Sequence, residues 1–148
     1  MINDEYFLAA LRLASGNDPI PGHVSAAARD VFELRVPRAV TAMPAEGATA
    51  RGVRGADGPR TVRFIAAGLT FDLEVTVGDG LIDVVGQVFP TPCEGSHVDV
   101  RTPHLTLTRS LADSGQFAAT GLPPGWLSVV CHRPGQEPVQ TRWVRVRP

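Results

Sequence analysis

The sequence predicts a mainly β protein, an antiparallel β-sandwich of about seven to eight strands preceded by two short α-helices. Three observations lead to this prediction. After residue 60, apolar and polar residues alternate in short runs, which is the period of half-buried strands. Turn residues such as Asp, Gly and Pro separate these runs at regular intervals. Before residue 36, apolar residues recur at helical spacing, and no helices alternate with the strands as a parallel sheet would require.

Two amphipathic helices are expected at the start of the chain. In residues 4–14, Phe7, Leu8 and Leu11 fall on one helical face, and residues 21–35 carry a second apolar stripe. Because isolated helices of this length are marginal in water, each stripe either packs on the β part of the chain or docks into a protein partner. The residues expected to contact such a partner are Val24, Ala28, Val31, Phe32 and Arg35.

The composition divides the chain into three parts. Residues 1–43 form the expected helical segment, in which residues 38–43 are compatible with a further helical turn. Residues 44–59 have no apolar period and many small residues, as expected of a flexible linker. Residues 60–148 form the expected β-sandwich domain.

The β part shows its clearest alternation in residues 69–77, and Gly78, Asp79 and Gly80 then predict a hairpin turn. In the next run, Gly86 predicts a bulge or a close backbone approach. The expected strands cover residues 61–65, 69–77, 81–89, 97–101 and 104–108, two more before and after the turn at 121–125, and 139–147.

The overall charge and composition limit the function classes. The formal net charge is −1, which argues against a nucleic-acid partner bound by phosphate neutralisation. No apolar run approaches the roughly 20 residues of a membrane span, so no membrane partner is expected. The acidic N-terminus does not fit a signal peptide, and the two cysteines are expected to be reduced. We therefore expect a cytoplasmic location.

Two turns resemble those of a known module. The Asp-Ser-Gly-Gln-Phe run at residues 113–117 and the Gly-Leu-Pro-Pro-Gly run at 121–125 resemble carboxypeptidase regulatory-like, or transthyretin-like, domains. Residues 86–88 match the Gly-x-Val of the first strand in these domains. The resemblance covers about residues 81–132. It implies an Ig-like sandwich that serves many host proteins and has no catalytic residues.

The whole layout resembles a family of small, mostly uncharacterised actinobacterial proteins. The matching segments are Ala-Ala-Arg at 27–29, Phe-x-x-Arg at 32–35, Gly-Pro-Arg at 58–60 and an aromatic-containing last strand at 142–144. Many members have Trp where Leu34 stands here, so the contacts of that segment can differ. The resemblance implies genomic company with alternative sigma factors and regulatory proteases, and hence a partner of that kind.

Few residues suggest chemistry. Cys93, His97 and Asp99 lie close together, with His97 and Asp99 on one face of a strand, and His104 lies one strand away. No Cys-x-x-Cys or His-Glu-x-x-His spacing accompanies them, so we interpret these residues as loop or surface residues and expect no metal or other cofactor. Cys131 and the next residue lie on opposite faces of a strand, which does not suit a nucleophile and its base. No enzyme is expected.

The sequence therefore favours a non-enzymatic protein-interaction or adaptor module. Its expected partner is an alternative sigma factor or an associated protease, held through the helices. The alternative is a carbohydrate- or peptide-binding β-sandwich, which would be favoured by an exposed Trp126 and disfavoured by a buried one. The loop residues expected to bind such a ligand are Cys93, Glu94, Pro124 and Trp126.

Overall fold

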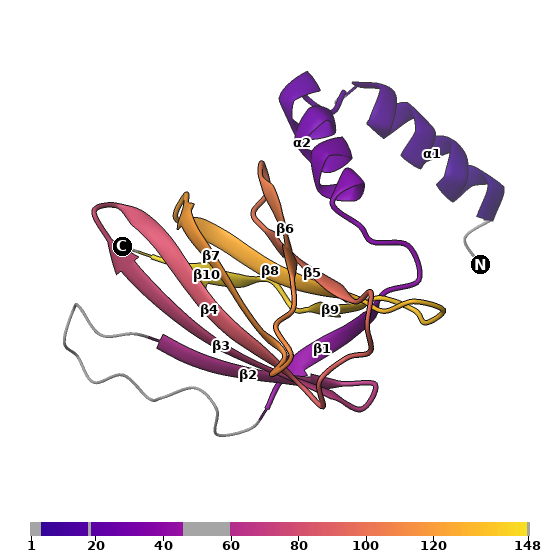
Figure 1. Ribbon diagram of the computed structural model, residues 1–148. Coiled ribbons are helices and arrows are strands. Elements are labelled where there is room, and N and C mark those ends of the chain that lie inside the picture. The colour runs from indigo at the N-terminus through magenta and orange to yellow at the C-terminus, as the bar shows by residue number, and fades with distance from the viewer. Residues whose placement is uncertain (1–3, 18, 46–59, 148) are drawn as a thin grey trace. The chain divides into compact units, whose positions relative to one another are not determined.

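The computed structural model of the chain describes residues 4–17, 19–45 and 60–147. It contains two compact units, Met1–Arg35 and Val36–Pro148. The first unit is helical and the second contains the strands (Figure 1). We describe each unit by itself.

The helical unit contains α1 (Asp4–Asn17) and α2 (Gly22–Glu33), so the prediction of two N-terminal helices is confirmed. Pro21, with φ of −54°, directly precedes α2. A fixed φ of this size is already suited to the start of a helix. No residue of α2 is buried, although the helix has an apolar stripe along one side. Among the described residues, no helix is long and apolar enough to cross a membrane.

The β unit is one sheet of ten strands within the described residues, in the order β6-β5-β8-β9-β1-β2-β3-β4-β7, with β10 beside β8. Its strands curve into a nearly barrel-like arrangement (Figure 1). The terminal strands of the path approach each other, since Arg109 Nε of β6 donates to the carbonyl oxygen of Ala118 in β7 at 3.1 Å. The strands are β1 (Val40–Pro44), β2 (Arg60–Ala66), β3 (Leu69–Gly78), β4 (Leu81–Phe89), β5 (His97–Arg101), β6 (Thr106–Ser110), β7 (Gln116–Leu122), β8 (Gly125–His132), β9 (Val139–Thr141) and β10 (Val144–Val146).

The mainly β prediction with two helices is confirmed, but the arrangement differs from a purely antiparallel one. Strand β1 pairs in parallel with β9, with Val40 opposite Val139, so the sheet is mixed. The other end of β1 pairs antiparallel with β2, where Met43 lies opposite Ile65. One short strand thus joins the two halves of the sheet, and the buried Ala42 lies at the change of partner.

Strand β1 also corrects the expected domain boundary. Residues 38–43 were compatible with a helical turn, whereas Val40–Pro44 is a strand and the β unit begins at Val36. Its hydrogen-bonding partners come from distant parts of the chain, which a local pattern does not reveal. Of the linker expected at 44–59, residues 46–59 lie outside the described residues.

The last expected strand, 139–147, is divided into β9 and β10, both of which pair with β8. Thr141 bridges the gap between the two pairings from the end of β9. Its hydroxyl oxygen accepts a hydrogen bond from the backbone N–H of Val129 at 2.9 Å, and its carbonyl oxygen accepts one from Ser128 Oγ at 3.0 Å. Both bonds are buried, so Thr141 satisfies polar groups that the interrupted ladder leaves without partners.

The core consists mainly of Val and Leu side chains. At Gly86 the close neighbour is a side chain rather than the predicted backbone, because the Phe117 ring on the neighbouring strand lies directly over this glycine. A Cβ atom at Gly86 would lie 2.1 Å from Phe117 Cζ, so the core requires glycine there. The largest fully buried side chains are Phe64, Phe71, Leu73, Ile82, Leu122 and Leu127.

Candidate functional site

The residues predicted to contact a partner through the second helix are all exposed in the helical unit. Val31 and Phe32 are each 66% exposed, and Val24 and Ala28 are also exposed. The Arg35 guanidinium lies 5.2 Å from the centre of the Phe32 ring, a cation–π contact that keeps this ring beside a positive charge. The predicted stripe therefore forms an apolar surface with a basic group at its C-terminal end.

The first helix adds further apolar side chains at the surface. Tyr6 and Leu13 are 80% and 71% exposed. A soluble protein usually exposes large apolar side chains singly, whereas contiguous sets of them mark interaction surfaces. We call the following set the helical apolar residues: Tyr6, Phe7, Leu8, Leu11, Leu13, Ile20, Val24, Val31 and Phe32, all exposed.

The predicted ligand loops do not come together. Cys93 and Glu94 follow the end of β4, and Pro124 and Trp126 follow the end of β7. Strands β4 and β7 are antiparallel neighbours, so the loops that follow them lie at opposite ends of the sheet. All four residues are exposed, and Trp126 is 48% exposed. One ligand site built from both loops is therefore not supported, although Trp126 is available by itself.

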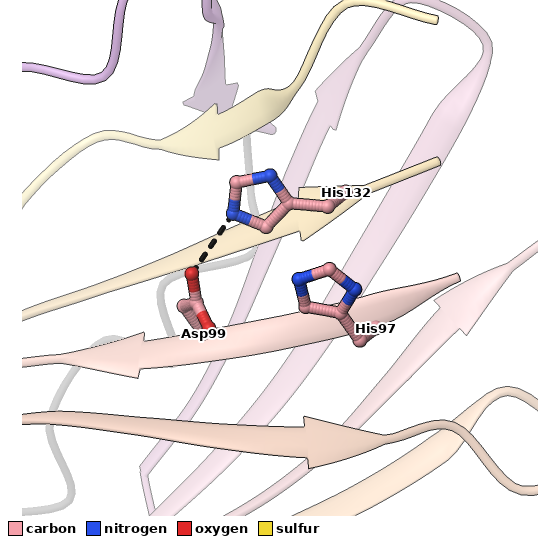
Figure 2. Close-up of side chains that lie close together, drawn as sticks. All are labelled: His97, Asp99 and His132. Carbon is pink, nitrogen blue, oxygen red and sulfur yellow. Dashed lines mark hydrogen bonds and ion pairs between the residues drawn. The ribbon is translucent and has the colours of Figure 1, made fainter. Parts of the chain in front are cut away.

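A cluster of polar residues lies on the opposite face of β5 from the core. His97 and Asp99 lie on the same face of β5, as predicted, while Val98 and Val100 between and beside them are buried. His132, the last residue of β8, lies directly opposite His97 in the antiparallel pairing of the two strands. Figure 2 shows the three side chains projecting from these adjacent strands toward one another.

The contacts in this cluster are short and well defined. His132 Nε2 donates to Asp99 Oδ2 at 2.9 Å, and Thr108 Oγ1 of β6 donates to Asp99 Oδ1 at 2.7 Å. The His97 and His132 rings are stacked, with centroids 4.7 Å apart and planes inclined by 15°. The side chains of His132 and Asp99 are 29% and 19% exposed, so the cluster is partly shielded from water and still open to it.

The sequence reasoning found two of these three residues. The other two candidates it named, Cys93 and His104, are not in the cluster; the Cys93 Sγ instead lies 3.7 Å from Ser96 Oγ. His132 was not proposed as a partner of His97, since the pair is brought together by the register of β5 against β8. The sequence signal available for His132 was its position at the end of the alternating apolar and polar run that predicts its strand.

A cation lies farther along the same strand face. Burial lowers the pKa of the Arg101 guanidinium, and the negative charge of Asp99 partly offsets this effect. The Arg101 guanidinium also lies 5.5 Å from the centre of the Trp143 ring. Alternation along β5 thus places an imidazole, a carboxylate and a guanidinium in one row: His97, Asp99 and Arg101.

Cys131 is a core residue and not a nucleophile paired with its neighbour. It is fully buried, while His132 lies on the other face, as predicted. Burial raises the pKa of the Cys131 thiol to about 11, with a smaller opposing effect of Arg133. A thiol that is hard to ionise is a poor nucleophile.

The chemistry that the cluster of His97, Asp99 and His132 offers is ligation of a cation.

Comparisons of the chain with protein-family models, with curated proteins and with solved structures find no match.

Proposed function

We propose that the chain is a non-enzymatic protein-interaction module that binds its partner through the helical apolar residues. The observation that carries this proposal is their exposure, which lies between 46% and 80% in side chains from α1, α2 and the segment between them. An amphipathic helix with such a face suits an apolar groove on another protein, with anchors at i, i+3, i+4 and i+7. On α2, Val24, Ala28, Val31 and Phe32 lie at i, i+4, i+7 and i+8, which places them on one helical face.

The partner that we propose is an alternative sigma factor or a protease-linked regulator in the cytoplasm. The support is the resemblance of residues 27–29, 32–35, 58–60 and 142–144 to small actinobacterial proteins of that genomic context. We also propose that the β unit is a variant of the transthyretin-like sandwich. Its support is that Gly115 and Gly121, which belong to the two resembling motifs, both have positive φ, a conformation that glycine adopts readily.

The test is affinity capture with the full chain from a native actinobacterial lysate, followed by mass spectrometry. The matched variants are Val31→Glu on the apolar stripe of α2 and Arg29→Glu, which changes the charge of an exposed polar position on the same helix. We expect the wild type and Arg29→Glu to capture a sigma factor or regulatory protease, and Val31→Glu to lose it. Circular dichroism checks that both variants remain folded.

Two outcomes contradict the proposal. Equal capture by Val31→Glu and wild type would show that the stripe does not contact the partner. Unfolding of the β unit in Val31→Glu would show that the stripe belongs to the core of the protein and is not a docking face.

A second candidate function is a carbohydrate- or peptide-binding module centred on Trp126. The observation that favours it is the 48% exposure of this side chain on β8, opposite Arg145 of β10. Exposed aromatic rings with a polar end are common at binding surfaces. Binding on a glycan and peptide array that is lost in Trp126→Ala and kept in Val31→Glu would support this candidate over the first.

A further inference from the structure

Three side chains with metal-binding atoms meet on the β unit. We propose that His97, Asp99 and His132 form a binding site for a divalent transition-metal ion, with Zn²⁺ as the representative ion. This site adds a ligand to the protein and does not depend on the proposed interaction function. The argument rests on the donor atoms, their spacing, their support and their access to solvent (Figure 2).

The donor set suits a transition metal. Two imidazoles and one carboxylate provide two nitrogen donors and one oxygen donor, the combination found in open zinc sites and in two-histidine, one-carboxylate iron sites. Mg²⁺ and Ca²⁺ prefer oxygen donors throughout, so this cluster should discriminate against both. Asp99 supplies the one negative charge among the three ligands, and Arg101 is the nearby cation that opposes binding.

The spacing of the donors is close to what an ion requires. One ligand atom from each residue lies within 4.8 Å of the other two. In a tetrahedral zinc site with bonds of about 2.0–2.2 Å, neighbouring donor atoms are about 3.4 Å apart. Asp99 Oδ2 and His132 Nε2 already approach to 2.9 Å. Side-chain movements of roughly 1 Å would bring the donors to coordination distances.

One rearrangement is needed. The His97 and His132 rings are nearly parallel, whereas an ion must lie in the plane of each ring that ligates it. One imidazole therefore turns about its side-chain torsions, and the ion replaces the proton shared by His132 Nε2 and Asp99 Oδ2. The χ2 torsion of histidine has a broad energy minimum, so this turn is inexpensive. The strands themselves need not move, since register already places His97 opposite His132.

Thr108 supports the site from the neighbouring strand. Its hydroxyl donates to Asp99 Oδ1 and leaves Oδ2 directed toward His132. Hydrogen bonds of this kind orient metal ligands, and their loss typically weakens metal affinity about 10- to 100-fold. Partial exposure of Asp99 and His132 provides access for the ion and room for water at its remaining coordination positions.

The test uses the full chain without a polyhistidine tag, freed of metal by a chelator that is then removed. Isothermal titration with Zn²⁺ measures stoichiometry and affinity, and Co²⁺ absorption reports the coordination geometry. We expect one ion per chain, four- or five-coordinate Co²⁺ spectra, and no comparable binding of Mg²⁺ or Ca²⁺. His97→Ala, His132→Ala and the nearly isosteric Asp99→Asn should each lose stoichiometric binding, and Thr108→Val should weaken it about 10- to 100-fold.

The matched controls are His104→Ala and His23→Ala, which remove exposed histidines outside the cluster. Both should bind Zn²⁺ as the wild type does. The proposal is overturned if the wild type shows no stoichiometric binding of Zn²⁺ or Co²⁺. It is also overturned if Asp99→Asn and the two cluster alanine variants, shown to be folded by circular dichroism, bind as tightly as the controls.

Discussion

The contact of Phe117 with Gly86 leads to a quantitative prediction for Gly86→Ala. The new Cβ would lie 2.1, 2.5 and 2.7 Å from three atoms of the ring, so the ring would have to retreat by more than 1 Å to reach an ordinary contact of 3.4 Å. Phe117 is only 5% exposed, and core atoms surround the space it would need. Overpacking typically costs 1–3 kcal/mol, partly offset by about 0.5–1 kcal/mol from replacing glycine with alanine. We expect a net destabilisation of about 1 kcal/mol.

The assay is urea unfolding followed by circular dichroism, with the free energy of unfolding obtained by linear extrapolation. The matched control is Gly78→Ala at the end of β3, where an added Cβ meets nothing within 4 Å and φ is not in the left-handed region. This variant should stay within about 0.5 kcal/mol of the wild type. Phe117→Leu removes the ring. In the double variant of Gly86→Ala and Phe117→Leu, the loss of free energy of unfolding should therefore be smaller than the sum of the losses in the two single variants.

Two results would refute this reasoning. If Gly86→Ala and Gly78→Ala unfold at the same urea concentration, the Phe117 ring does not restrict position 86. If the effects of Gly86→Ala and Phe117→Leu are simply additive, the cost of the alanine arises somewhere other than its contact with the ring.

Three further predictions concern polar groups and thiols of the β unit. Thr141→Val removes the acceptor of the buried Val129 N–H, so it should lower the free energy of unfolding in urea by about 1–3 kcal/mol. Thr141→Ser keeps the hydroxyl and should lower it less. Equal losses in the two variants would show that the hydroxyl is not needed. Cys131 has a thiol pKa of about 11 in the folded state against 9.0 when unfolded, so the folded state holds this proton more tightly. The contribution of this thiol to the free energy of unfolding should therefore be complete below pH 9 and fall by up to about 3 kcal/mol as pH rises to 11. The Cys131→Ala variant should lack this pH dependence. At neutral pH a thiol reagent should label the exposed Cys93 and spare Cys131; labelling of both in the native state would contradict the burial argument.

The elements that the sequence predicts well are those whose signals are local. The alternation of Leu69, Phe71 and Leu73 with polar residues predicts β3, and all three are buried. The hairpin at residues 78–80 is also confirmed, with positive φ at Asp79 and Gly80. A two-residue turn of this kind depends only on its own residues, because they must accept that backbone conformation.

The elements that were missed depend on contacts between distant residues. Strand β1 is stabilised by β9 on one side and β2 on the other, and five residues with no marked alternation do not predict such a position. His132 reaches Asp99 across 33 residues of sequence, through the register of β8 against β5. A shift of that register by one residue would move His132 to the other face, so the cluster could not be predicted before the strand pairing was known.

The distribution of buried residues also bears on how the proposed interaction can be tested. Within the described residues, every buried side chain belongs to the β unit, from Ala42 to Val146, and none belongs to α1 or α2. The β unit therefore has a hydrophobic core of its own, while the apolar face of the helices has none. Val31 is 66% exposed in the helical unit, so a charge there removes apolar contact area from the helical face. For this reason loss of partner capture in a folded Val31→Glu variant can be assigned to the interface.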